Sequence, residues 1–397
     1  MKWFVILLAG FLFVTAGCGG APSGTFEPKE KAGIQVLSLR WVKRLYPSLP
    51  NFLVPTLAEE HDRFNPVETS SAGFDLELKR VFIGTSLGDL YCLDWFRGET
   101  VWRFNIQDSV GSTPLYDPSR KTVFFGADNG KYYAVHARSG RLLWTTDTGS
   151  EIRRSTLLYK NTLYVVNASN TVLALDPDSG EVLWQYRRPL LEGFSSSGHA
   201  GLARYNNQLI TGFSDGYVVA IDALTGMVRW EHDLASEITA MSANGEVRLL
   251  DADATPAVSG EVVVVASVTG GLQGLEADSG TVLWTHPDIT GVTGLAASNG
   301  MVYASRTNFG LTAVDPTDGR VIWSQKFRTG VLQDPVTYND VLLVADSIFG
   351  FYVVSAATGE LLQRVDQREG FFARPSVGGG YMLIIGNYGT LYAMSIL

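Results

Sequence analysis

A twelve-residue pattern recurs along this chain and constrains the fold more than any other feature. Its clearest copies are LALDPDSGEVLW (173–184), VAIDALTGMVRW (219–230) and TAVDPTDGRVIW (312–323). In each copy, alternating apolar residues end at an Asp, and polar residues lead to a Gly that can adopt positive φ. A second apolar stretch then ends at a Trp. The pattern predicts two antiparallel strands joined by a tight turn, with the tryptophan marking the register.

The pattern repeats at intervals near forty residues. Its last position is occupied by Trp41, Trp102, Trp144, Trp184, Trp230, Trp284 and Trp323, and by Gln363 in one further repeat. A second turn marker occurs eight times, at Gly88, Gly130, Asn170, Gly216, Gly270, Gly310, Gly350 and Gly389. This period is typical of a propeller blade, which buries both of its faces only by packing against neighbouring blades. We therefore predict an all-β, eight-bladed β-propeller of four-stranded antiparallel blades.

The two ends of the domain predict how the ring closes. Residues 34–45 look like the last strand of a repeat that lacks its first three strands, while residues 375–394 supply three strands and stop. The N-terminal strand, which carries Trp41, is therefore expected to complete the C-terminal blade. Such sharing removes an exposed edge strand. Residues 34–397 are accordingly expected to form a single propeller domain.

The recurring side chains are assigned structural roles. We expect each tryptophan to pack between adjacent blades. Short carboxylates at the end of the third strand are expected to accept hydrogen bonds from turn amides. These carboxylates are Asp94, Asp176, Asp222 and Asp315. Because His136, Glu276 and Ser355 replace them in other repeats, a metal ligand in every blade is not expected. Cys92 stands where other repeats carry Ala or Gly, which favours a small buried residue over a reactive thiol.

The N-terminus has the organisation of an export signal. Residues 1–17 contain Lys2 and an apolar run too short to span a membrane, and they end in Thr15-Ala16-Gly17 before Cys18. This end resembles the lipobox of bacterial lipoproteins, which implies acylation of Cys18 and, with Gly19 following, sorting to the outer membrane. The alternative is an ordinary secretory signal cut near Ala16. Residues 18–33 contain little to bury and are expected to form a flexible tether.

Charge and composition exclude several functions. The net charge of −9, without a basic stripe interleaved with aromatics, disfavours binding to nucleic acid. The two cysteines rule out a disulfide framework, and the five histidines show no metal-ligand spacing. No Gly-x-Ser-x-Gly elbow or other nucleophile arrangement is present. We therefore expect no metal, no cofactor and no enzymatic activity.

Two intervals between tryptophans are longer than the rest. Trp184 and Trp230 are 46 residues apart, and Trp230 and Trp284 are 54 apart. The additional residues, within 187–197 and 234–255, precede the first strands of successive blades, so they should lie side by side on one rim. Loops on a rigid scaffold are free to vary and commonly carry function.

The insertions combine apolar and charged side chains, as expected for a surface that binds a protein. The candidate partner-binding residues are Leu190, Leu191, Glu192, Arg248, Asp251 and Asp253. In the alternative interpretation, the leucines pack into the propeller and the charges only solvate long loops.

A family resemblance makes this assignment more specific. The repeats resemble those of pyrroloquinoline-quinone-type propellers, and residues 248–256 (RLLDADATP) resemble a loop of the lipoprotein propellers of the outer-membrane β-barrel assembly machinery. In that family, the acidic pair and a neighbouring apolar loop contact the periplasmic domains of the barrel-forming subunit. The resemblance implies those roles for Asp251, Asp253 and the neighbourhood of Leu191. The family has a basic residue where this chain has Glu192.

Three functions follow from these features. The first is a non-catalytic scaffold, lipid-anchored at the periplasmic face of the outer membrane, which binds the barrel-forming subunit and assists folding and insertion of β-barrel proteins, with unfolded outer-membrane proteins as further partners. The second is another periplasmic propeller that binds a protein or cell-wall partner. The third is a quinone-dependent dehydrogenase, a class that shares these blades but typically has a longer chain, adjacent cysteines and a calcium site.

Overall fold

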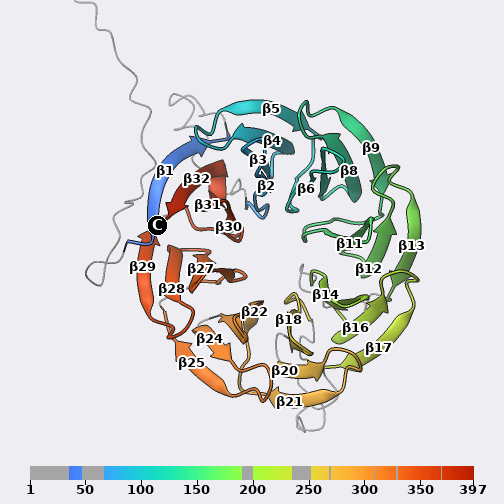
Figure 1. Ribbon diagram of the computed structural model, residues 1–397, viewed down its shortest axis with the longest axis vertical. Helices are drawn as coiled ribbons and strands as arrows, with labels where there is room; N and C mark the ends of the chain where they lie inside the picture. The colour runs from blue at the N-terminus through green and yellow to red at the C-terminus, as the bar shows by residue number, and fades with distance from the viewer. Residues whose placement is uncertain are drawn as a thin grey trace, which may run out of the picture.

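A closed ring of eight four-stranded sheets makes up the computed structural model of this chain (Figure 1). The structure describes residues 35–46, 67–189, 200–234, 252–267, 270–307, 309–327, 330–367 and 369–397. Within these ranges the one helical element is the short 3₁₀ turn η1 (Asn387–Gly389). No helix in the described part of the chain is long and apolar enough to cross a membrane. The predicted eight-bladed propeller is confirmed.

Blades 1 to 7 each use four consecutive strands. Blades 1 to 4 comprise β2 (Gly73–Asp75), β3 (Arg80–Gly84), β4 (Asp89–Asp94), β5 (Thr100–Asn105), β6 (Leu115–Asp117), β7 (Thr122–Gly126), β8 (Lys131–His136), β9 (Leu142–Asp147), β10 (Leu157–Tyr159), β11 (Thr162–Asn167), β12 (Thr171–Leu175), β13 (Val182–Arg187), β14 (Ala203–Tyr205), β15 (Gln208–Gly212), β16 (Tyr217–Asp222) and β17 (Val228–Asp233). Blades 5 to 7 comprise β18 (Ala257–Ser259), β19 (Val262–Ser267), β20 (Gly271–Glu276), β21 (Val282–His286), β22 (Val292–Ser298), β23 (Met301–Arg306), β24 (Gly310–Val314), β25 (Val321–Gln325), β26 (Val336–Tyr338), β27 (Val341–Asp346), β28 (Gly350–Ser355) and β29 (Leu361–Asp366).

Blade 8 is shared between the two ends of the chain. It comprises β30 (Ser376–Gly378), β31 (Tyr381–Gly386), β32 (Thr390–Ile396) and, as its outer strand, β1 (Leu37–Arg44). The blue β1 lies beside the red β32 in Figure 1, with Trp41 opposite Ala393 in the antiparallel register. The predicted closure by the N-terminal strand is confirmed.

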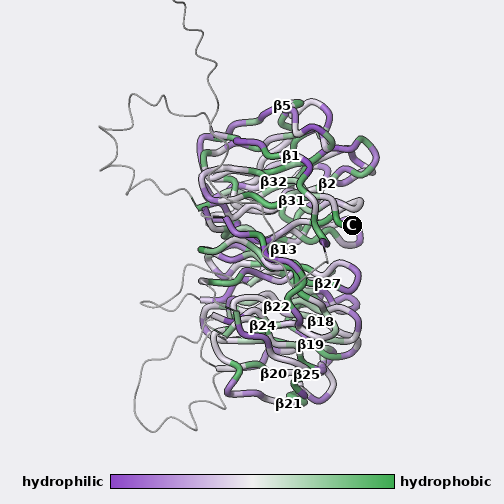
Figure 2. The backbone as a smooth tube through the Cα atoms, turned by 90° about the vertical axis from the view of Figure 1, so that its left-hand side faces the viewer, coloured by the Kyte–Doolittle hydropathy of each residue, from purple (hydrophilic) through white to green (hydrophobic). Residues whose placement is uncertain are grey.

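Burial follows the order of the strands within each blade. In blade 3 every residue of the third strand, β12, is buried, whereas the outer strand, β13, alternates between exposed and partly buried positions. Apolar side chains of neighbouring blades meet between the sheets, as Phe124 of blade 2 and Leu163 of blade 3 do in one cluster. Seen edge-on, the ring is a flat disc (Figure 2). Its core is therefore a series of interfaces between blades.

The tryptophans lie at these interfaces. In blade 2 the Trp144 indole N–H donates to the carbonyl of Pro177 in blade 3 at 3.1 Å. Its ring lies against Gly180, where φ is +75° and an added Cβ would be 2.5 Å from the indole. Glycine is thus required both by the turn and by the indole above it. The indole N–H groups of the other repeat tryptophans make the same bond to the next blade, in the pairs Trp41–Trp95, Trp102–Ala137, Trp184–Ala223, Trp230–Ala277, Trp284–Pro316 and Trp323–Ala356.

The acidic residues that end the third strands stabilise the following turns, as expected. Asp176 Oδ1 accepts hydrogen bonds from the backbone N–H groups of Asp178 at 2.9 Å and Ser179 at 2.8 Å. Equivalent bonds reach Asp94, Asp222 and Asp315. The turn glycine of blade 5 is Gly271, which has a positive φ, and lies one residue after the predicted Gly270.

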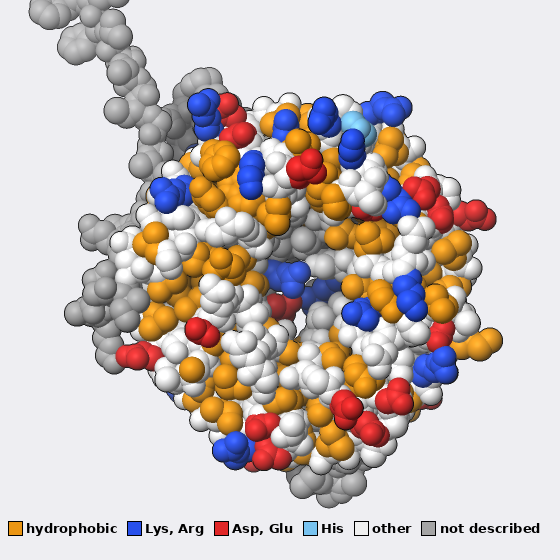
Figure 3. Space-filling model, viewed as in Figure 1, with side chains coloured by type: hydrophobic (Ala, Val, Ile, Leu, Met, Phe, Trp, Pro, Cys, Tyr) orange, Lys and Arg blue, Asp and Glu red, His pale blue; other side chains and the backbone are white. Residues whose placement is uncertain are grey.

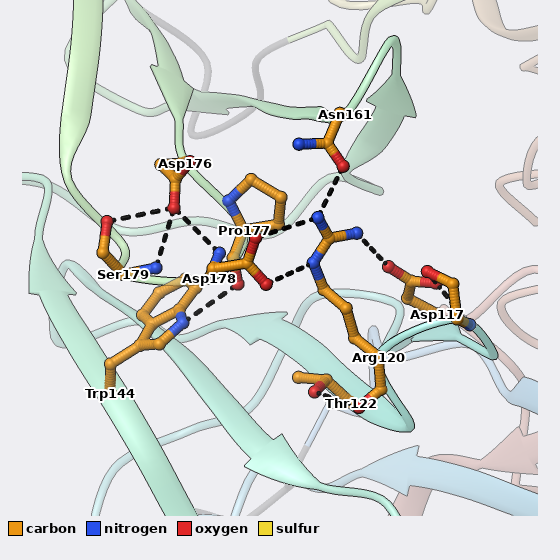
Figure 4. A network of polar contacts seen from close by, with 10 residues as sticks. Asp117, Arg120, Thr122, Trp144, Asn161, Asp176, Pro177, Asp178 and Ser179 are labelled. Atoms are coloured by element: carbon orange, nitrogen blue, oxygen red, sulfur yellow. Dashed lines mark hydrogen bonds and ion pairs between the residues drawn. The ribbon is translucent and has the colours of Figure 1, made fainter.

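A polar clamp reinforces the contact between blades 2 and 3 (Figure 4). Arg120, after β6, donates to Asp117 of its own blade at 2.8 Å and to Asp178 of blade 3 at 2.7 Å. A third bond, 2.5 Å long, reaches the side-chain oxygen of Asn161 in blade 3. One guanidinium therefore joins three turns of two blades.

Gln363 occupies the position of the missing tryptophan in blade 7, at the place where the ring closes. An indole there would need an acceptor in the turn between the third and fourth strands of blade 8, but this connection is interrupted by the two chain ends. Instead, Gln363 Oε1 accepts from the N–H groups of Val36 at 2.9 Å and Leu37 at 2.8 Å, and Nε2 donates to the Leu37 carbonyl at 3.2 Å. The Gln363 side-chain amide can both accept and donate hydrogen bonds. An indole only donates, so it could not satisfy the two backbone N–H groups at the start of β1.

Replacing Gln363 with Ala should destabilise the whole ring. The change leaves buried backbone groups of Val36 and Leu37 without a partner, which costs about 3 kcal/mol of unfolding free energy. Urea denaturation of the variant and the unmodified chain measures the difference. Gln185→Ala, at an exposed position of β13, is the matched control and should have little effect. Equal stability of the two variants would contradict a role of Gln363 in closure.

Candidate protein interface and central cavity

One face of the disc carries the connections between blades. After the outer strand of each blade, the chain returns past the turn between that blade's second and third strands. Two backbone hydrogen bonds show this path: the Ile106 N–H donates to the Gly88 carbonyl at 2.9 Å, and the Leu234 N–H donates to the Gly216 carbonyl at 3.1 Å. We call this side, with its connections and turns, the connector face. Both insertions identified in the sequence belong to it.

Most of the predicted partner-binding residues are not covered by the structure. Leu190, Leu191, Glu192, Arg248 and Asp251 lie outside the described residues, as does Cys18. The predicted signal (1–17) and tether (18–33) lie outside them as well. Asp253 is described, at the end of the second insertion and four residues before β18 begins.

The described ends of the two insertions lie side by side. The backbone N–H of Gly201, just before β14, donates to Thr255 Oγ1, just before β18, at 2.9 Å. The approach is close enough that a Cβ on Gly201 would lie 2.7 Å from this hydroxyl. The described ends of the two insertions are therefore adjacent, as predicted, where the chain returns to the propeller.

These ends form part of the wall of a central cavity. The cavity has a volume of about 580 Å³ and is lined by residues of all eight blades, including Asp253, Thr255 and Gly201. Arginine and carboxylate side chains are visible in the central hollow of Figure 3. Asp253, predicted as a rim residue, is thus at the cavity wall.

Three arginines organise the cavity. Arg154 donates to the Asp253 carbonyl at 3.0 Å and forms an ion pair with Asp334 at 3.7 Å, linking blade 3 to blades 5 and 7. Arg374 of blade 8 donates to Ser155 of blade 3 at 2.9 Å. The third, Arg153, pairs with Asp128 of blade 2 at 3.1 Å and with Glu151 of its own blade at 2.8 Å. These contacts hold opposite sides of the ring at a fixed separation.

The sequence interpretation did not identify these arginines. A usable signal exists. In blades 2 and 3 the first strand is preceded by a buried apolar residue, Val110 or Ile152, and then by a segment that reaches the cavity wall. Blade 2 has Gly111 and Ser112 after this apolar residue, whereas blade 3 has Arg153 and Arg154. An alignment of the segments that precede the first strands would have shown that Arg153 and Arg154 stand in blade 3 where blade 2 has small residues.

The described residues bear on two further kinds of site, a metal site and a reactive thiol. Their His, Cys, Asp and Glu side chains form no group of three that could hold a metal ion. Cys92 is buried within β4, between blades 1 and 2, and burial raises the pKa of its thiol to about 11. The side chain is therefore a neutral packing residue, as the sequence suggested.

A buried carboxylate lies where blade 8 meets blade 1 on the connector face. Glu68 is fully buried, and its side chain accepts bonds from Ser86 Oγ at 2.7 Å and Ser86 N at 3.0 Å. Burial raises the pKa of Glu68 from 4.5 to about 7, although the bonds from Ser86 oppose the shift. Nearby Glu369 also has a raised pKa because it is buried. In both groups burial therefore disfavours the charged form relative to an exposed glutamate.

Fold and repeats together define a propeller of the pyrroloquinoline-quinone repeat class. The chain belongs to the BamB family: the family profile described as "Outer membrane protein assembly factor BamB" matches residues 88–325 and 307–397. The BamB proteins of Shewanella oneidensis and Yersinia pestis are 23% identical over 330 residues and 26% identical over 327. These alignments cover 80% and 79% of this chain and 82% of each relative.

Solved structures agree on the fold. The crystal structure of BamB from Moraxella catarrhalis matches with a TM-score of 0.72 at 20% identity, covering 91% of this chain and 100% of that one. Quinohemoprotein alcohol dehydrogenase from Comamonas testosteroni matches with a TM-score of 0.64 at 15% identity, covering 92% and 77% respectively. At these identities the likeness concerns the fold alone.

Glu68 should make stability depend on pH. The pKa of Glu68 is about 7 in the folded state and 4.5 for an ordinary glutamate. The protonated side chain therefore adds to the free energy of unfolding below about pH 4.5, and this stabilisation is lost as the pH rises to about 7. The loss amounts to up to about 3 kcal/mol. Glu68→Gln should reduce this slope, as measured by urea denaturation from pH 4 to 8. Glu181→Gln, at an exposed turn position, is the control. An unchanged slope in Glu68→Gln would contradict the assignment.

Proposed function

We propose that this chain is a non-catalytic scaffold of outer-membrane protein assembly that binds the barrel-forming subunit through the two insertions of the connector face. Its relatives are named as outer membrane protein assembly factors. A scaffold needs a rigid frame, a variable binding surface and a way to remain near the membrane. The chain offers the first two in its ring and insertions.

The observation that carries this proposal is the bond between Gly201 and Thr255. It brings the returns of both insertions together at the central opening, so that one partner can touch both. Asp253 is only two residues from Thr255 and lines the same cavity. Apolar residues from the first insertion and carboxylates from the second then form one composite surface. A central apolar patch surrounded by charge is the usual composition of a protein interface.

The cavity supports binding rather than catalysis. Its described charges are engaged in contacts across the ring, such as those of Arg154 with Asp253 and Asp334. These contacts stabilise the frame. Positioning a partner by such a frame requires no reacting group.

The anchor completes the proposal. Acylation of Cys18 would hold the protein at the periplasmic face of the outer membrane, because acyl chains contribute about 0.8 kcal/mol for each buried methylene. Residues 18–33 would serve as the tether between lipid and ring. The propeller is then confined to the layer in which the barrel-forming subunit presents its periplasmic domains.

Replacing both Asp251 and Asp253 with Ala should weaken co-purification with the barrel-forming subunit from outer membranes. The loss should be about tenfold or more, as for truncation of charged residues at the centre of an interface. Glu181→Ala with Asp318→Ala, at exposed turns of the opposite face, is the matched control. Undiminished recovery of the subunit would reject this interface, and recovery of a different partner would favour another periplasmic role.

A further inference from the structure

The face of the disc opposite the connector face is uniform in six blades and enlarged in two. We call it the turn face, because it carries the turns between the first and second strands and between the third and fourth strands of the blades. The first of these turns has two residues in blades 3 to 8, as at 160–161 in blade 3, but four in blades 1 and 2, at 76–79 and 118–121. Two residues suffice to join such strands, so the enlarged turns of blades 1 and 2 are available for another role.

Apolar side chains are exposed on the turns of blade 1. Leu76 and Leu78, in the enlarged turn, are 52% and 38% exposed, and Phe96, at the tip of the turn between β4 and β5, is 58% exposed. We call these three residues the apolar patch. Polar residues are usual at such tips. The residues that correspond to Phe96 in blades 2 to 7 are Arg138, Asp178, Leu224, Asp278, Thr317 and Ala357. Blade 1 is thus the repeat that places an aromatic ring at this tip.

The apolar patch lies beside the seam between blades 8 and 1. Phe96 meets Tyr381 of blade 8 edge-on, with the ring centroids 6.4 Å apart. A Cδ atom of Leu76 is 3.7 Å from the place that a Cβ on Gly379 would occupy. Both residues of this blade 8 turn, 379 and 380, are glycines. Because glycines carry no side chain, this turn does not shield the patch, and its residues stay exposed.

Basic side chains surround the apolar patch on the turns of blades 1 and 2. The exposed ones are Lys79, Arg97, Lys121, Arg138 and Arg141. None of these five forms an ion pair within the part of the chain that the structure describes. Lys79 Nζ lies 5.4 Å from the centre of the Trp95 ring, next to Phe96 in the chain. Two exposed carboxylates, Glu77 and Glu99, lie on the same turns, so positive charge is in excess around the patch.

The far side of the turn face is acidic. The turns of blades 5, 6 and 7 expose the carboxylates of Glu261, Asp278, Asp318, Asp340 and Glu360, and Arg320 is the one basic residue in these turns. Figure 3 looks onto this face: Lys and Arg side chains gather at the top, over blades 1 and 2, and Asp and Glu side chains gather at the bottom, over blades 5 and 6. A broad anionic surface would attract one side of this face and repel the other, which fixes the orientation of the ring.

The N-terminal segment joins the ring on the turn face, next to blade 1. Leu37, the first residue of β1, is opposite Ile396 in the register. The Ile396 N–H donates to the carbonyl of Gly380, in the bare turn of blade 8, at 2.9 Å. The proposed tether, residues 18–33, would have a root-mean-square span of about 20 Å as a flexible chain. An acyl group on Cys18 would therefore stay close to the apolar patch.

We propose that the turn face of blades 1 and 2 binds the surface of a phospholipid bilayer that contains anionic headgroups. This inference rests on the anchor of the proposed function and adds to it a contact made by the ring itself. The apolar patch would enter the interfacial layer of the bilayer, as exposed apolar residues of peripheral proteins do. The surrounding Lys and Arg side chains would lie at the level of the phosphates and be attracted to them.

The anchor makes a modest contact sufficient. An acyl chain on Cys18 keeps the ring near the bilayer, so binding through the turn face becomes an intramolecular event with a high effective concentration. When blades 1 and 2 rest on the lipid, the acidic turns of blades 5 to 7 are held away from it. The connector face then points away from the bilayer, which leaves its insertions free for the barrel-forming subunit.

Fluorescence quenching by lipid measures this contact. Leu76→Cys, Phe96→Cys and Thr317→Cys each give the acylated full-length chain one site for an NBD dye, because Cys92 is buried. The labelled proteins are reconstituted into phosphatidylcholine vesicles that contain about 30% phosphatidylglycerol and a doxyl-labelled quenching lipid. Emission from positions 76 and 96 should be quenched at least about twofold more than emission from position 317, which is the equivalent of Phe96 on the acidic side. Equal quenching at the three positions would overturn the proposal.

Charge reversal tests the basic residues and separates the two proposals. The variant Lys121→Glu, Arg138→Glu and Arg141→Glu should lower the quenching at position 76 to the level at position 317. The matched control, with the same change in net charge on exposed residues of the connector face, is Lys131→Glu, Arg187→Glu and Lys326→Glu, and it should leave the quenching unchanged. Full quenching in the first variant would contradict the proposal.

The same reversal should leave co-purification of the barrel-forming subunit unchanged, and Asp251→Ala with Asp253→Ala should leave the quenching unchanged, so each proposal can fail without the other. Loss of the subunit from the charge-reversal variant, with quenching retained, would assign the turn face to a protein partner and likewise overturn the proposal.

Discussion

The seam between β1 and β32 is the contact on which the rest of the structure depends. A blade exposes apolar groups on both faces until a neighbour covers each of them, so an open row of eight blades would leave two apolar faces and a free strand edge. Pairing of β1 with β32 removes these ends. Leu397 N donates to the Val36 carbonyl at 2.8 Å, so the last residue of the chain bonds directly to the start of the first described strand.

The seam also explains the exception in the repeat. In the other blades a Trp reaches a carbonyl in the next turn, and the turn glycine leaves room for its ring. At the seam there is no continuous turn, and Gln363 instead satisfies both donor and acceptor groups of the entering strand. The same structural requirement, a bond from each outer strand to the next blade, is thus met by different chemistry where the covalent connection is missing.

A closed ring allows its connections to vary. Because the blade interfaces provide the stability, the connector face can carry insertions before blades 4 and 5. The arginines of the cavity brace the ring across its centre.

The repeat pattern was sufficient to predict the number of blades, the strand order and the closure, because strand alternation, turn glycines and tryptophan register are local and recur in nearly every blade. It could not show that Asp253 lines a cavity with Arg154 and Arg374, since these residues are about a hundred to two hundred positions apart and meet only when the ring closes. Local periodicity therefore determined the blade, and circular packing decided which distant residues share a site.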